Sequence, residues 1–444
     1  MNLRRWLMPG IGVKRWILVV FAGLLLLALA GAHVLRQTTR DLEPGGAIGT
    51  LIDVATLQFL PFALRGLVVG IVGLTLVLAG ALGVVRAFTS PLRAGDADQP
   101  LVEIIYQKRF LARGPRIVAI GGGTGLSTLL RGLKEHTSNL TAVVTVADDG
   151  GSSGVLREEL GIPPMGDIRN CIAALADAEP LMNQLLQYRF PVAGEADGDG
   201  AGAPGIGGHP VGNLLLAAMT AVQGGDFEEG VRRINRILAV RGRVVPVTGT
   251  PLTLHARTAD GTVVDGQSRV QAMAGIERVW VTPTDVMASA DALAAIAEAD
   301  LIVIGPGSLY TSLLPSLLLP DVRDAVLGAT APRIYVCNVA TQVGETTGLD
   351  LIGHVEALIA HTAPGLVDLV LANDRMDARI PAGWQAETVR LRWPPAIPAA
   401  PRLVLGDVVD PDNAHHHDPG RLAAAIMREL DAGSRVRRRA GRSA

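Results

Sequence analysis

The sequence predicts a doubly wound, mostly parallel α/β sheet that carries a β-rich insertion and follows two transmembrane helices. Three observations lead to this fold class. Short aliphatic strands alternate with helical patterns after Arg116, glycine loops follow several of these strands, and two long uncharged stretches precede them. Strands that alternate with helices pair in parallel, because each helix carries the chain back to the same end of the sheet.

The two uncharged stretches run over residues 17–35 and 66–85. A helix of about 20 apolar residues crosses the hydrocarbon core of a bilayer, so the pair predicts a transmembrane hairpin. Basic residues precede the first stretch and follow the second. The positive-inside rule then predicts a multi-pass protein of the cytoplasmic (inner) membrane, with both ends and the soluble domain in the cytoplasm. A cleaved signal peptide is the alternative for the first stretch, but a second stretch and a cytosolic-looking domain follow it.

Composition divides the 444 residues into four parts. We expect a membrane hairpin over 1–93, a linker over 94–115, a nucleotide-binding domain over 116–431 and a basic disordered tail over 432–444. The net charge of −2 argues against a nucleic-acid binder. The two cysteines, Cys171 and Cys337, are expected to be reduced thiols.

The elements of the soluble part follow from the spacing of apolar residues. Strands are predicted over 117–120, 142–146, 301–304, 333–337 and 366–371. Helices are predicted over 126–135, 168–176, 181–186, 211–221, 228–238, 288–297 and 422–430. Residues 192–208 read as a solvated glycine-rich insertion, and residues 244–281 alternate in the manner of a small β-sheet.

A phosphate site is predicted where the first strand meets the run Gly121-Gly122-Gly123-Thr124-Gly125. Glycine lets the backbone approach an anion closely, and a helix N-terminus offers N–H groups without partners. The second strand ends in Asp148 and Asp149, which could accept from a ribose hydroxyl, hold Mg²⁺, or act only as turn acids. No acid–base pair, nucleophile or triad can be assigned from spacing, so catalytic residues stay unknown.

Further polar residues occupy turns that we expect on the same carboxyl edge of the sheet. Each also has a structural explanation as a helix cap, packing turn or surface charge. The candidate ligand-binding residues are Gly121, Gly122, Gly123, Thr124, Gly125, Ser127, Asp148, Asp149, Ser152, Ser153, Asp167, Arg169, Asn170, His209, Asn213, Gly305, Gly307, Ser308, Tyr310, Thr311, Asn338 and Gln342.

Three features near the C-terminus are less informative. The run His415-His416-His417 reads as a loop and not as a metal site, and His416 and His417 remain weak candidates for ligand contacts. Trp384 could stack on a ligand, although core packing explains it as well.

The motifs GGGTGLSTLLRGLK, TVADDGGSSG, GDIRNC, GHPVGNLLLA, AVRGRVVPV, IGPGSLYTSLLP and YVCNVATQVGET fall in this order between Gly121 and Thr346. Together they resemble the YvcK-like proteins, the UDP-N-acetylglucosamine-binding gluconeogenesis factor family inside the CofD-like superfamily. The resemblance covers roughly half of the chain and leaves out the hairpin. It implies a Rossmann-like, CofD-like fold and binding of UDP-N-acetylglucosamine (UDP-GlcNAc).

The resemblance leaves two functions open. One is a membrane-tethered nucleotide-sugar sensor that regulates carbon metabolism, cell-envelope synthesis and cell shape and is not an enzyme. The other is a CofD-like transferase that moves a phospholactyl-type group from a nucleotide diphosphate to a hydroxyl acceptor, with Mg²⁺ held by Asp148 and Asp149. The first is preferred, because motifs specific to the transferase branch are not recognisable. No further cofactor is expected, and homo-oligomers and envelope-synthesis proteins stay open as partners.

Overall fold

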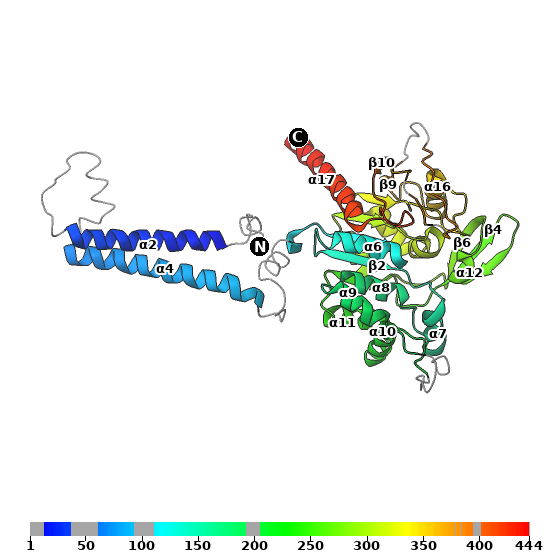
Figure 1. Cartoon of the computed structure of the whole chain (residues 1–444), viewed down its shortest axis with the longest axis horizontal. Coiled ribbons are helices and arrows are strands. Elements are labelled where there is room, and N and C mark those ends of the chain that lie inside the picture. The colour runs from blue at the N-terminus through cyan, green and yellow to red at the C-terminus, as the bar shows by residue number, and fades with distance from the viewer. Residues whose placement is uncertain are drawn as a thin grey trace. The chain divides into compact units, whose positions relative to one another are not determined.

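The computed structural model describes residues 13–36, 61–92, 111–191, 205–377, 379–381, 383–393 and 401–443. The chain forms two compact units, Met1–Ala112 and Arg113–Ala444 (Figure 1). The linker predicted over 94–115 and the insertion predicted over 192–208 fall mostly outside the described residues.

The described part of the first unit includes the helices α2 (Val13–Arg36) and α4 (Phe62–Leu92), which pack along each other. Glycines make the contact close: a Cβ on Gly80 would lie 2.6 Å from Cγ2 of Val20, and one on Gly83 would lie 2.2 Å from the Trp16 ring. The helical hairpin predicted from the sequence is therefore present. Its outer side chains are apolar and exposed.

The membrane-spanning part of that prediction is not confirmed. A transmembrane helix needs about 20 consecutive apolar residues. In the part of the chain that the structure describes, no helix combines the necessary length with the necessary apolar character.

The second unit is built on a sheet of seven strands in the order β10-β9-β8-β7-β1-β2-β3. All its pairings are parallel, which confirms the predicted doubly wound α/β class. The strands are β1 (Ile117–Gly121), β2 (Leu140–Val144), β3 (Arg243–Pro246), β7 (Leu301–Ile304), β8 (Arg333–Val336), β9 (Leu369–Asn373) and β10 (Arg402–Gly406). Every residue of β1, β2, β7 and β9 is buried, as expected for strands covered on both faces.

The order of the strands reverses between β1 and β7. The chain runs outward from β1 through β2 to β3, returns to the other side of β1 as β7, and continues outward to β10. In open parallel sheets, ligands bind beyond the carboxyl ends of the strands at such a reversal.

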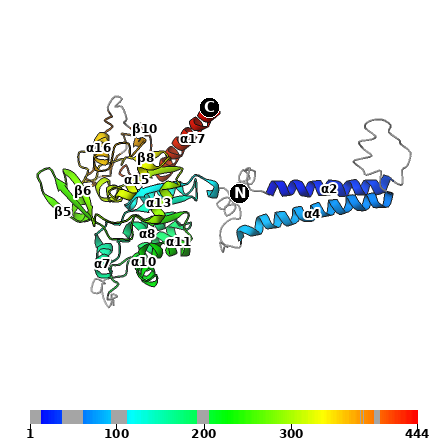
Figure 2. The same cartoon turned by 180° about the vertical axis from the view of Figure 1, so that it is seen from behind.

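Helices cover both faces of this sheet. On one face α8 and α17 pack against α6, and on the other α13 packs against α15 (Figures 1 and 2). The bounds are α6 (Gly123–Leu133), α7 (Gly151–Leu160), α8 (Gly166–Leu175), α9 (Glu179–Gln187), α10 (Val211–Val222), α11 (Phe227–Ile237), α13 (Ala290–Ala297), α15 (Pro320–Gly328), α16 (Leu351–His361) and α17 (Pro419–Ser443). Shorter turns are η1 (Leu111–Arg113), the π-helix η2 (Leu309–Leu313) and α14 (Leu314–Leu317).

A second, antiparallel sheet has the order β5-β4-β6. Its parts are β4 (Thr253–Thr258), β5 (Val263–Asp265), α12 (Gln267–Gln271) and β6 (Ile276–Thr282). This is the predicted β-rich insertion, with one correction at its start. β3 falls within the stretch expected to belong to the insertion, but it forms the edge of the main sheet beside β2.

The C-terminal tail also differs from the prediction. Residues 432–443 were expected to be disordered, whereas α17 continues through them to Ser443. The arginines of this segment are good helix formers, so charge did not stop the helix that began at Pro419.

Candidate functional site

Four turns meet where the sheet changes direction. They follow β1, β2, β7 and β8, and because these strands are parallel the turns lie on one edge. The turn after β1 is wedged between its neighbours. A Cβ on Gly125 would lie 2.6 Å from the Pro306 carbonyl oxygen, and a Cβ on Gly122 would lie 2.3 Å from Oδ2 of Asp167. Only glycine fits these two positions without displacing backbone or a carboxylate.

Two helices, α6 and α7, begin at these turns, and their N-cap residues Gly122 and Gly150 make no side-chain capping bond. α8 follows α7, and its first N–H, that of Gly166, donates to the Ser153 hydroxyl at 3.1 Å. The first N–H groups of a helix have no partner within it and carry partial positive charge. Gly123, at the start of α6, has φ +65° and so needs glycine as well. The arrangement can hold an anion.

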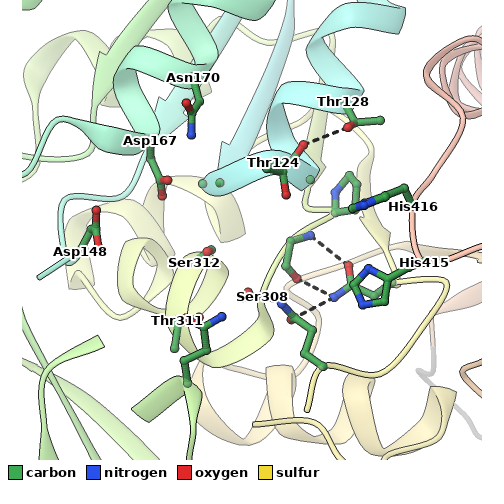
Figure 3. Close-up of a pocket in the computed structure, with 18 of the residues that line it drawn as sticks. Thr124, Thr128, Asp148, Asp167, Asn170, Ser308, Thr311, Ser312, His415 and His416 are labelled. Atoms are coloured by element: carbon green, nitrogen blue, oxygen red, sulfur yellow. Dashed lines mark hydrogen bonds between the residues drawn. The ribbon is translucent and has the colours of Figure 1, made fainter. Parts of the chain in front are cut away.

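The turns enclose a cavity of about 450 Å³ (Figure 3). Among the labelled side chains, Asp148, Asp167 and Asn170 lie on one side of it, and His415 and His416 lie on the other. Ser308, Thr311 and Ser312 come from the turn after β7. The lining residues are Gly122, Gly123, Thr124, Gly125, Thr128, Asp148, Gly150, Asp167, Asn170, Gln267, Ser268, Gln271, Pro306, Gly307, Ser308, Thr311, Ser312, Asn338, Val339, Ala340, Gln342, His415, His416 and His417.

Two carboxyl groups with raised pKa values face the cavity. Burial raises the pKa of Asp167 to about 7, and the neighbouring charge of Asp148 adds to the rise. Burial also raises the pKa of Asp148, although the N–H of Gly150 donates to its Oδ1 at 3.0 Å and acts in the opposite direction. The charge of Asp148 disfavours ionisation of Asp167, as that of Asp149 does for Asp148. A proton, a cation or a hydroxyl donor would therefore be stabilised beside these carboxyls.

Asp149 does not line the cavity. Its Oδ1 accepts hydrogen bonds from the backbone N–H and the hydroxyl of Ser268, at 2.9 and 2.8 Å. These bonds attach α12 of the small sheet to the turn after β2, and α12 contributes Gln267, Ser268 and Gln271 to the cavity wall. The pair of adjacent aspartates therefore divides its roles, one facing the cavity and one holding the wall.

Arg169, a candidate ligand-binding residue, does not line the cavity. Its Nη1 donates to Oδ1 of Asn213 at 2.8 Å, and Asn213 in turn donates to Ser152 at 3.1 Å. Ser152 is bonded to Nδ1 of His209 at 2.7 Å. This buried network connects α7, α8 and α10. Arg169 also donates to Asn170, which does line the cavity, so it acts on the site through a neighbour.

Asn338, after β8, holds the turn that follows β7. It accepts from the Gly307 N–H at 3.1 Å and donates to the Gly307 carbonyl at 2.9 Å. Gln342 donates to the Ser308 hydroxyl at 2.6 Å. Both amides face the cavity as well, and their pairing fixes where the Ser308 hydroxyl lies.

The histidine run forms an aromatic group with Trp384. The ring centroids of Trp384 and His415 are 4.2 Å apart, and the His416 ring meets Trp384 edge-on at 5.4 Å. Burial lowers the pKa of His417 to about 4, so this imidazole stays neutral. Searching the described residues finds no group of three or more His, Cys, Asp or Glu side chains that could hold a metal ion.

The structure places twelve of the candidate residues on the cavity wall. They are Gly122, Gly123, Thr124, Gly125, Asp148, Asp167, Asn170, Gly307, Ser308, Thr311, Asn338 and Gln342. The other candidates lie behind the wall: Gly121, Ser127, Asp149, Ser152, Ser153, Arg169, His209, Asn213, Gly305 and Tyr310. Tyr310, one of these candidates, is buried and packs edge-on against His361.

Several lining residues were missed or undervalued. Those of α12 come from the small sheet, far along the chain, and no local motif marks them. His415 and His416 follow a weakly informative stretch, and only their place beside Trp384 brings them to the cavity. Pro306 and Ser312 belong to the turn after β7, which the sequence already indicated as a candidate. The sequence did not show which residues of that turn face the cavity and which only pack.

Comparison with known proteins identifies the family. A family profile described as 2-phospho-L-lactate transferase CofD matches residues 117–389. A Nostoc sp. protein named "Putative gluconeogenesis factor" is 43% identical over 432 residues, which is 96% of this chain and 92% of its own. The "Gluconeogenesis factor" of Bacillus subtilis is 48% identical over 264 residues, 59% of this chain and 80% of its own.

A solved structure supports the same assignment. The crystal structure of a Bacillus halodurans protein superposes with a TM-score of 0.63 at 40% identity, covering 71% of this chain and 100% of that one. The chain therefore belongs to the CofD family, with relatives that are named gluconeogenesis factors.

The raised pKa of Asp167 predicts a pH-dependent stability difference. A carboxyl whose pKa rises from 3.8 to about 7 on folding binds its proton more tightly in the folded chain, so stability falls as pH rises through that window. Asp167→Asn does not lose stability in this way, because its amide does not ionise. Urea unfolding between pH 4 and 8 should show the variant gaining stability relative to the wild type up to about pH 7 and levelling off above it. A difference that stays constant with pH would contradict the assignment.

Proposed function

We propose that this member of the CofD family is a nucleotide-sugar sensor that binds UDP-GlcNAc and regulates carbon metabolism, cell-envelope synthesis and cell shape. One observation carries the proposal: the N-termini of α6 and α7, which their glycine N-cap residues leave without a side-chain cap, and two glycine turns converge on a single cavity. A diphosphate is the part of the ligand that these groups suit, since it offers several anionic oxygens to backbone N–H donors. The names of the relatives support a metabolic role.

The diphosphate is assigned to the turn after β1 and the hydroxyls of Ser308 and Thr311. Within the described part of the chain, the lining residues include neither lysine nor arginine. The anion would therefore be held by N–H and hydroxyl donors, without a cationic side chain. This favours reversible binding over the charge neutralisation that a leaving phosphate needs.

The remaining parts of the ligand have complementary partners. Asp148 and Asp167 accept hydrogen bonds from ribose or sugar hydroxyls. The uracil is assigned to the side of the cavity formed by His415 and His416, where Trp384 is 44% exposed. Aromatic rings stack on a base without requiring a particular sequence of donors.

A transferase is the second candidate, and the Asp148–Asp167 pair is the observation that favours it. Two carboxylates together with substrate phosphates are a common way of holding Mg²⁺. The pair replaces the Asp148–Asp149 site expected from sequence, because Asp149 is engaged by Ser268. Bound there, Mg²⁺ would neutralise charge that develops on a departing nucleotide diphosphate.

We also propose that the α2–α4 hairpin attaches the protein to a lipid membrane. Leu18, Phe21 and Leu25 are 70%, 65% and 63% exposed on its outer surface. An exposed apolar surface of this kind is stabilised when lipid or protein covers it. Attachment would place the sensor close to envelope-synthesis proteins.

Ligand binding should depend on glycine at position 123. Gly123→Val adds a side chain where the backbone approaches the diphosphate and strains a residue with φ +65°. Calorimetry with UDP-GlcNAc should detect no binding. Gly275→Val is the matched control, because Gly275 has φ +68° and open space around it, away from the cavity. Equal loss of binding in both variants would mean that strain, and not the site, is responsible.

Sensor and transferase differ in what alanine does at the acid pair. A sensor should bind UDP-GlcNAc without consuming it over hours with Mg²⁺. Asp148→Ala and Asp167→Ala should each weaken binding by about 1.5–3 kcal/mol, the contribution of a hydrogen bond to a charged group. Chromatography of the nucleotide products decides the matter. Release of a nucleotide that requires Mg²⁺ and disappears in Asp148→Ala would overturn the sensor in favour of the transferase.

Membrane attachment makes a separate prediction for the full chain. The wild type should sediment with membranes, resist extraction by high salt and be released by detergent. Replacing Leu18, Phe21 and Leu25 together by Asn should shift the protein toward the soluble fraction, because it removes apolar area from the lipid contact. A wild-type chain that stays soluble without detergent would refute the attachment.

A further inference from the structure

Glu345 is a buried acid immediately behind the cavity wall. Its residue is 3% exposed, and neither carboxyl oxygen has a hydrogen-bond partner among the described residues. The same holds for the hydroxyl of Thr311, which is 1% exposed. Buried polar groups are nearly always paired. The Thr311 hydroxyl adjoins this carboxyl, so the two groups can satisfy each other, and a ligand that takes the hydroxyl hydrogen changes what the carboxyl accepts.

The acid lies against the turn that faces the proposed ligand. The hydroxyls of Ser308 and Thr311 adjoin its carboxyl, and both residues also line the cavity. The backbone N–H of Glu345 donates to the Gln271 carbonyl at 3.2 Å, which anchors the acid to α12. The turn after β7 is thus placed between Glu345 and the cavity.

Hydroxyl groups impose a choice on this arrangement, because each has a single hydrogen to donate. Ser308 already accepts from Gln342, so its own hydrogen goes either back to Glu345 or forward to a ligand. An ionised Glu345 accepts only and draws these hydrogens away from the cavity. A protonated Glu345 can donate to a hydroxyl oxygen and leave the hydroxyl hydrogens for an anion in the cavity.

We propose that Glu345 is the positioning residue of this anion site: its carboxyl sets the direction in which Ser308 and Thr311 donate, so that an anionic ligand binds with uptake of one proton from solvent. The proton adds to a carboxylate oxygen of Glu345, and no other bond forms or breaks. The inference rests on the anionic ligand proposed above and names the group that couples its binding to pH.

The surroundings of Glu345 are suited to this role. Burial raises the pKa of Glu345 to about 7, whereas the adjacent hydroxyls act in the opposite direction. Tyr310 on η2 and Tyr335 on β8 are the titratable groups that face it from the described elements. Burial raises the pKa of Tyr310 to about 12 and that of Tyr335 well above its usual value, so both stay neutral near pH 7. Of these three groups, only Glu345 therefore responds to a small change of pH near 7.

Calorimetry on the full chain tests the proposal, with UDP-GlcNAc as the probe between pH 5 and 8.5. We compare the wild type with Glu345→Gln, which keeps the shape and removes the acid. Asp167 and the histidines of the cavity are present in both proteins, so their response to pH cancels in the ratio of the two Kd values. The Kd of the wild type divided by that of Glu345→Gln should be constant below about pH 6 and rise about tenfold per pH unit above about pH 7.

Proton uptake gives a second measurement. Titrations at pH 7.5 in buffers of different ionisation enthalpy should show the wild type taking up roughly three quarters of a proton more per ligand than Glu345→Gln, because a pKa of about 7 leaves about a quarter of the free carboxyl already protonated. Glu345→Met supplies a variant of similar volume if Gln disturbs the fold, and it should behave like Gln. Equal pH profiles and equal proton uptake in all three proteins would overturn the role of Glu345.

Sulfate separates this proposal from the identity of the ligand, because it stays a dianion over the whole pH range. Suppose UDP-GlcNAc does not bind but sulfate binds with the pH profile that depends on Glu345. The sensor proposal then fails and the positioning role stands. If UDP-GlcNAc binds with no dependence on Glu345, the sensor proposal stands and the positioning role fails. Binding of neither anion overturns both.

Discussion

The site depends on the close contact between the glycine turns that follow β1 and β7. A side chain on Gly125 would come within 2.6 Å of the Pro306 carbonyl oxygen, so the two turns can meet only because this position lacks a Cβ. Their meeting closes the gap where the order of the strands reverses. It also directs the start of α6 into the cavity, where the first N–H, that of Gly123, meets the Asp167 carboxyl. The parallel sheet places the turns on one edge, and glycine brings them within reach of one ligand.

The electrostatics of the cavity follow from what it lacks as much as from what it contains. Among the described lining residues there are acids and neutral donors but neither lysine nor arginine. Asp167 on one side and Glu345 behind the other have pKa values raised to about 7 by burial. An anion that enters such a site favours the protonated form of both acids. Burial of the two carboxyls, which brings their pKa values to about 7, therefore links ligand affinity to proton binding.

Sequence patterns predicted the frame of the domain better than its additions. The strands expected over 117–120, 301–304 and 333–337 match β1, β7 and β8 closely, because buried parallel strands appear as short continuous aliphatic runs. Sequence patterns did not assign β3 and β10 to the main sheet. β3 begins a stretch in which apolar and polar residues otherwise alternate, and β10 is only partly buried.

The site was predicted in its backbone and only partly in its side chains. Glycine turns are local signals, so Gly122 to Gly125 and Gly307 were found. The roles of polar side chains depend on contacts that are distant in sequence. Arg169 donates a hydrogen bond to Asn213, and Asp149 accepts one from Ser268. Nothing within the motifs of Arg169 and Asp149 indicates either partner.

The small sheet is the addition that matters most for function, because it forms part of the cavity wall. Asp149 binds the N-terminal part of α12 through Ser268, and Glu345 binds its C-terminal end through Gln271. A third connection runs from β6, where the Val279 N–H donates to His361, whose ring contacts Tyr310 in η2. Each connection ends on a residue next to a turn that faces the ligand. A ligand that reorients Ser308 and Thr311 would therefore act on the same short segments that hold the small sheet.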